Sequence, residues 1–142
     1  MKFTATAAAI TTLLAATGAS ASGYCGGSTF VNKSSGGSPL VSDCQELARQ
    51  YSSVAKAIEV GTDRGIEVHR YGTCVFGVIQ RSPSGFYIGD DDVKDIIRDS
   101  IAVFQLNGRV GTEGDMSCTA YSTTGNRPAD GYAPVWWGIY HA

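Results

Sequence analysis

Apolar and polar residues alternate along residues 65–80, and this alternation predicts two β-strands joined by a bend at Gly72-Thr73. In the first strand, Glu67 and His69 would point to the polar side of the sheet. The second strand, residues 74–79, is apolar on both faces, which is typical of a central strand with covered faces. We therefore expect this second strand to be central in a sheet with at least one face covered.

A first helix is predicted immediately upstream. Ser42 and Gln45 have the spacing of a capping box, and Gly61 would end the helix. Between these signals, apolar side chains recur at helical spacing at Leu47, Tyr51, Val54 and Ile58.

A second helix has the most regular pattern in the chain. Asp90, Asp91 and Asp92 begin it, where carboxylates suit the open N–H groups and the helix dipole. Asn107-Gly108 would close it. Its apolar stripe comprises Val93, Ile96, Ile97, Ile101 and Phe104.

Three more strands complete the predicted order. They lie at residues 86–88, around Cys118, and at residues 135–140. Residues 22–39 are rich in Gly and Ser and would form a loop-like arm. We expect an α+β fold in which a small antiparallel sheet carries two helices packed on one face, with two disulfides.

The first 21 residues have the features of a secretory signal peptide. Lys2 precedes an apolar run of small residues, and Ala19-Ser20-Ala21 has the form of a cleavage site. Cleavage would leave residues 22–142, a length that suits a single domain. We therefore expect a secreted, extracellular protein.

The four cysteines predict two disulfides, because an even number in an exported chain is typical of a disulfide framework. Three pairings are possible. Cys44 precedes Leu47 by three residues on the same helical face, so its sulfur should point toward the sheet and Cys74. Cys25 would then pair with Cys118.

Composition excludes several classes of function. Residues 22–142 carry 10 basic and 13 acidic side chains, and no basic stripe suggests binding to nucleic acid. No segment after the signal is long and apolar enough for a transmembrane helix, and the cysteine spacing does not suit zinc. We expect no metal, no cofactor and a monomer. Asn32-Lys33-Ser34 is a sequon for N-glycosylation of Asn32.

Catalytic signals are weak. His69 and Glu67 on one strand face could form an acid–base pair of a small hydrolase, but no partner or pocket accompanies them. A solvated histidine on a strand face explains the pattern more simply, and we assign no catalytic residue.

Aromatic residues on the last strand indicate a binding surface. Trp136 and Tyr140 would share the face opposite Trp137, together with Tyr71 and His69 from the first hairpin. Aromatic clusters on a sheet face bind proteins, glycans or membranes. The alternative is that the arm, residues 22–39, folds over this face and buries it.

Several segments in order resemble the fungal family of secreted effectors known as necrosis-inducing factors. They are Cys25 with residues 28–30 (STF), residues 38–44 (SPLVSDC), 72–78 (GTCVFGV), 88–93 (IGDDDV), 99–101 (DSI), 108–111 (GRVG), 116–118 (MSC) and 137–140 (WGIY). The chain departs from the family at residues 58–60, where the family has a tryptophan.

The resemblance implies an extracellular, disulfide-bonded protein that acts on a host or a competitor. It implies no catalytic residues. We expect a non-enzymatic effector that binds a host or competitor protein or another cell-surface component. The alternatives are an antimicrobial protein similar to killer toxins, a likeness at the level of fold, and the small hydrolase that would use His69 and Glu67.

Overall fold

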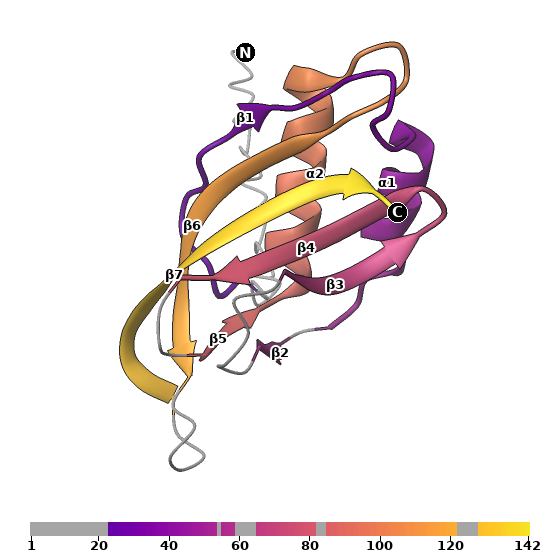
Figure 1. Cartoon of the computed structure of the whole chain (residues 1–142). Coiled ribbons are helices and arrows are strands. Elements are labelled where there is room, and N and C mark those ends of the chain that lie inside the picture. The colour runs from indigo at the N-terminus through magenta and orange to yellow at the C-terminus, as the bar shows by residue number, and fades with distance from the viewer. Residues whose placement is uncertain (1–22, 54, 59–64, 82–84, 122–127) are drawn as a thin grey trace, which may run out of the picture.

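A computed structural model describes residues 23–53, 55–58, 65–81, 85–121 and 128–142 of the 142-residue chain. Within these described residues, two helices and seven strands follow one another (Figure 1). They are β1 (Val31–Asn32), α1 (Val41–Gln50), β2 (Lys56–Ile58), β3 (Ile66–Tyr71), β4 (Cys74–Gln80), β5 (Gly85–Ile88), α2 (Asp90–Phe104), β6 (Thr112–Tyr121) and β7 (Pro128–His141).

The seven strands form one antiparallel sheet. Its order is β2-β5-β6-β7-β4-β3, and β1 pairs with the free part of β6. The β3–β4 hairpin expected from the alternation is present, and β4 lies inside the sheet between β7 and β3, as its apolar faces predicted. Strand β3 forms one end of the sheet. The long β7 pairs with β6 and β4 and forms the centre.

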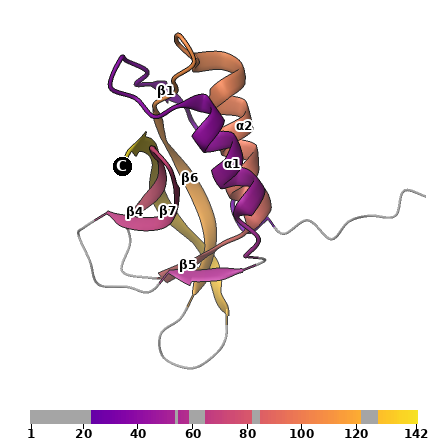
Figure 2. The ribbon, with the colours of Figure 1, turned by 90° about the vertical axis from the view of Figure 1, so that its right-hand side faces the viewer.

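The expectation of a small sheet with two helices packed on one face is wrong. The sheet dominates the fold and curls into a half-barrel, with α1 and α2 side by side next to it (Figures 1 and 2). The reason lies in β6 and β7, which are 10 and 14 residues long. Strand twist accumulates over such lengths, and register shifts at Glu67/His69 and Thr119/Tyr121 add local bends.

Helix α1 is shorter than predicted. It begins at Val41 with Leu40 as N-cap, ends at Gln50, and uses no side-chain cap from Ser42. The apolar spacing that suggested a helix as far as Ile58 has another origin. Ile58 is a buried residue of β2, opposite Phe86 of β5. Pairing with a strand distant in sequence therefore overrides the local pattern.

Helix α2 begins where predicted but ends at Phe104, before the expected Asn107-Gly108. It spans Asp90–Phe104 and buries Val93, Ile96 and Ile97. Asp92 caps its start, because its Oδ2 accepts the N–H of Gly89 at 2.8 Å.

The core lies between the helices and the sheet. Trp137 of β7 is fully buried at its centre. Its ring stacks with Phe76 of β4 at 6.3 Å between centroids and meets Phe30 of the arm edge-on at 5.2 Å. Both predicted disulfide pairs are present, Cys44–Cys74 and Cys25–Cys118, and no cysteine is free.

The N-terminal arm is fixed along β6. The N–H of Gly26 donates to Ser117 O at 2.8 Å, and the N–H of Thr29 donates to Asp115 O at 2.9 Å. Only glycine fits at position 114, because an added Cβ would lie 1.9 Å from the carbonyl oxygen of Thr29. Gly114 is opposite Trp137, so the arm packs on the face of β6 that carries the core.

Candidate functional site

The outer face of the sheet carries two aromatic side chains, Trp136 and Tyr140 of β7. Residues directly opposite each other in an antiparallel pair share a face. Trp136 is opposite Ile79 of β4, whereas the buried Trp137 is opposite Val78, so the two tryptophans point to opposite sides of the sheet. Tyr140 is 42% exposed and Trp136 is half-buried. The arm pairs with the edge of β6 and packs Phe30 against Trp137 on the core side, while its Lys33 reaches Glu113 at the border of the outer face.

Two glycines let these rings lie close to the backbone. Gly77 of β4 is directly opposite Gly138 of β7. A Cβ on Gly77 would lie 2.6 Å from the hydroxyl oxygen of Tyr140. A Cβ on Gly138 would meet three atoms of the six-membered ring of Trp136 at 3.0 to 3.7 Å. The two rings therefore lie over neighbouring glycines. We call Trp136, Tyr140, Gly77 and Gly138 the aromatic platform.

Ion pairs border the platform. Glu67 of β3, opposite Gly77, binds Arg70 through two hydrogen bonds. On the β6 side, Glu113 pairs with Lys33 at 3.0 Å and Asp115 pairs with Arg81 at 3.4 Å. Each carboxylate therefore has a cation beside it. Burial raises the pKa of Tyr140, with a further rise from Glu67, so its hydroxyl remains a hydrogen-bond donor at neutral pH.

The structure does not place His69 and Tyr71 on this face. A register shift between Glu67 and His69 puts His69 opposite Phe76 and Tyr71 opposite Cys74, on the core side. The His69 ring packs against Tyr51, at 5.6 Å between centroids. The expectation that His69 shares a face with Glu67 is therefore wrong, and with it the acid–base pair. Arg70 takes the outward position instead.

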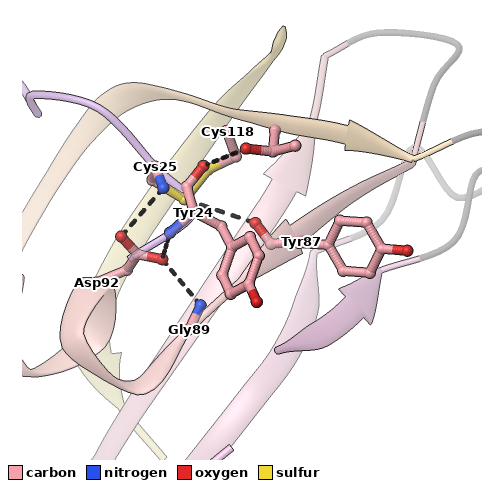
Figure 3. The surroundings of a disulfide bond; sticks show 7 residues. Tyr24, Cys25, Tyr87, Gly89, Asp92 and Cys118 are labelled. Carbon is pink, nitrogen blue, oxygen red and sulfur yellow. Dashed lines mark hydrogen bonds between the residues drawn. A yellow bond between two sulfur atoms is a disulfide. The ribbon is translucent and has the colours of Figure 1, made fainter. Parts of the chain in front are cut away.

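The second notable environment surrounds the Cys25–Cys118 disulfide (Figure 3). Asp92 is 8% exposed, and its carboxylate accepts the backbone N–H groups of Tyr24, Cys25 and Gly89 at 2.8 to 3.1 Å. Burial raises the pKa of Asp92, although these hydrogen bonds oppose the rise.

A pocket of about 190 Å³ lies beside this carboxylate, between the arm and α2. Its other two carboxylates, Asp95 and Asp99, are paired with Arg98. Asp92 thus fixes the start of α2 to the arm, whereas Asp95 and Asp99 form exposed ion pairs.

Other predicted features are partly outside the described residues. The signal peptide, residues 1–21, lies entirely outside them. Asn32 is exposed on β1, where its Oδ1 accepts the N–H of Ser34 at 2.9 Å, and its glycosylation stays a prediction. Within the described ranges, no three His, Cys, Asp or Glu side chains are grouped to hold a metal ion, and no helix is long and apolar enough to cross a membrane.

Sequence reasoning missed the two glycines of the platform. Isolated glycines within strand patterns signal a close approach by another group. Gly77 and Gly138 both have this signal, but their alignment depends on the register between β4 and β7.

Comparison with known proteins identifies the family. Residues 24–118 match the model of the Hce2 family, described as "pathogen effector; putative necrosis-inducing factor". The chain belongs to this family. The match includes α1, α2 and all four cysteines, and the family implies extracellular action.

A curated relative is also similar. It is the protein named "Probable chitinase LysM18" of Penicillium expansum, which is 30% identical over 134 aligned residues. The alignment covers 85% of this chain but 9% of the relative. The chain thus spans a small part of that protein.

Proposed function

We propose that this chain is a secreted effector that acts without catalysis, by binding a component of a host or competitor cell surface through the aromatic platform. The observation that carries the proposal is the pair of an exposed Tyr140 and a half-buried Trp136 on the outer face of the sheet. Large, rigid aromatic side chains give contact area at a low cost in conformational entropy.

The comparisons support an extracellular place of action for this chain. Membership of an effector family favours action outside the producing cell, and residues 1–21 would supply the export signal. The relative of Penicillium expansum is named as a chitinase, an enzyme class that acts on a cell-wall polymer. Because this chain matches only a small part of that protein, the name favours the cell wall as the place of action and not the activity itself.

The hydrolase alternative loses its support in the structure. Glu67 binds Arg70 on the outer face, whereas the His69 ring packs on Tyr51 on the core side. The two side chains cannot then work as a pair on one substrate.

Infiltration of the purified protein into plant tissue tests the proposal, with growth inhibition of other fungi as a parallel assay. We expect a cell-death or growth response that the double variant Trp136→Ala/Tyr140→Ala lacks. Tyr71→Ala is the matched control, because Tyr71 is 38% exposed but lies on the other side of the sheet.

Absence of any response in all hosts and competitors would refute the effector role. An unchanged response from the folded double variant would refute the role of the platform. Circular dichroism and the melting temperature show that each variant is folded.

A further inference from the structure

We infer that the aromatic platform binds a neutral β-1,4-linked polymer of N-acetylglucosamine, with Trp136 and Tyr140 stacking on consecutive sugars. The inference rests on the proposed function and names the chemical class of its target. It is argued from the shape of the platform, its charge and its hydrogen-bonding groups.

The shape favours a sugar polymer. Gly77 and Gly138 are opposite each other, so their Cα atoms are about 5 Å apart. One glycine lies under the Tyr140 ring and the other under the Trp136 ring. An extended chain that lies across these two strands can therefore contact both rings. In β-1,4-linked sugars the substituents are equatorial, so each ring presents a flat C–H face that packs on the negative face of an aromatic ring.

The charge favours a neutral polymer. The three carboxylates bordering the platform, Glu67, Glu113 and Asp115, are each paired with a cation. The face therefore has little net charge to attract an acidic polymer such as pectin or a cationic one such as deacetylated chitin.

The hydrogen-bonding groups fit the substituents of N-acetylglucosamine. The side chains of Arg81 and Asp115 are 56% and 59% exposed, and those of Arg70 and Glu67 are 54% and 39% exposed. Guanidinium groups donate and carboxylates accept, so this border can satisfy both hydroxyl and acetamido groups. The acetamido methyl group adds apolar contact with the rings, which a plain hexose lacks.

A protein partner fits the same surface less well. The anchors of protein interfaces are aromatic side chains in well-packed pockets that become fully desolvated on binding. Here charged groups lie directly beside both rings, and their desolvation would be costly. A hydrated sugar polymer can leave these groups in water.

Depletion of the full-length secreted protein onto washed, insoluble chitin tests the inference, with cellulose and an uncharged resin in parallel. We expect saturable retention on chitin that 0.5 M salt leaves unchanged, since screening of about 3–10 Å affects only charge-driven binding. Trp136→Ala and Tyr140→Ala should each weaken retention at least about tenfold, the loss of a stacking contact. Tyr71→Ala should bind as the wild type does.

Gly77→Ala gives a second, positional test. It keeps both aromatic residues, but its methyl group would lie 2.6 Å from the hydroxyl oxygen of Tyr140 and so displace that ring. We expect weaker retention with little change in melting temperature. Normal retention by a folded Trp136→Ala/Tyr140→Ala variant would overturn the inference even if Gly77→Ala failed to fold.

Other outcomes separate the inference from the proposed function. No retention of the wild type on chitin, or equal retention on chitin and cellulose, overturns the inference. If the platform variants still abolish the cell response in that case, the proposed function stands with another target. Retention on chitin without any cell response would instead refute the effector role and leave the inference intact.

Discussion

The two disulfides of this protein hold different kinds of junction. Cys44–Cys74 joins α1 to β4 across 30 residues of sequence, and both cysteines are fully buried. Cys25–Cys118 joins the N-terminal arm to β6 across 93 residues, and Cys25 is only half-buried. Each junction also has an aspartate that accepts hydrogen bonds from the backbone. Asp43 accepts one N–H at the first junction, and Asp92 accepts three at the second.

The two aspartates show how surroundings decide the effect of similar hydrogen bonds. Asp43 is half-buried near the surface, and the N–H and hydroxyl of Thr73 lower its pKa. Asp92 accepts three N–H groups, yet burial raises its pKa. Desolvation therefore outweighs hydrogen bonding at the arm junction, and hydrogen bonding outweighs desolvation at the helix junction.

Among the variants considered, removal of either disulfide should lower the free energy of unfolding the most. By the loop-entropy model, replacing Cys25 and Cys118 with alanine should cost about 4.7 kcal/mol of unfolding free energy, and replacing Cys44 and Cys74 about 3.6 kcal/mol. Urea denaturation measures both. If the arm detaches without unfolding the core, the cost at Cys25–Cys118 will be the smaller one, and the order predicted here will be reversed.

Asp92→Asn should have the next largest effect. The amide keeps one oxygen but turns an NH₂ group toward a backbone N–H, so at least one of three buried donors loses its acceptor. We expect a loss of about 1–2 kcal/mol, since relief from burying a charge offsets part of the penalty. Asp43→Asn, at the surface, should cost less in the same denaturation experiment. An equal or larger loss for Asp43→Asn would contradict the contrast in burial.

Two glycines beside these aspartates sharpen the contrast. Gly72 has φ +53°, and an added Cβ would lie 2.6 Å from the Asp43 carboxyl group. Gly72→Ala should therefore destabilise the protein by about 1–3 kcal/mol. Gly23 is the matched control, because its added Cβ would meet Asp92 at an ordinary 3.4 Å. Gly23→Ala should change the melting temperature little, and a large fall there would show that the arm is packed more tightly than the contacts indicate.

Local sequence signals were sufficient where an element depends on its own residues. Helix α2 has acidic residues at its start and a complete apolar stripe, so its existence and its first residue follow from the sequence. The disulfide pairing followed from the helical face of Cys44. The position of Trp136 on the face opposite Trp137 followed from strand alternation.

Features that depend on distant pairing could not be predicted in this way. Ile58 has helical spacing from Leu47, but β5 recruits it into a strand. A single register shift moves His69 to the core side, although simple alternation places it with Glu67. The N-terminal part of β7, residues 128–134, precedes the strand expected at residues 135–140, so the predicted sheet is smaller than the observed one.

The smallest expected effect is the change in folding stability with pH that Asp43 and Asp92 cause. The lowered pKa of Asp43 stabilises the fold above about pH 4, and this contribution disappears as pH falls through the folded-state pKa. The raised pKa of Asp92 acts in the opposite direction, so the folded state gains stability as pH falls through that value toward 3.8.

Melting temperatures of the wild type and both Asp→Asn variants between pH 6 and pH 3 test whether the contributions of Asp43 and Asp92 change in opposite directions with pH. Glu46, whose hydrogen bond to Arg49 lowers its pKa to about 2, contributes equally to all three proteins and cancels in the differences. The difference in melting temperature between the wild type and Asp92→Asn should widen as pH falls toward 4. The difference between the wild type and Asp43→Asn should narrow below pH 4. If both differences changed in the same direction with pH, burial would not explain the contrast between Asp43 and Asp92.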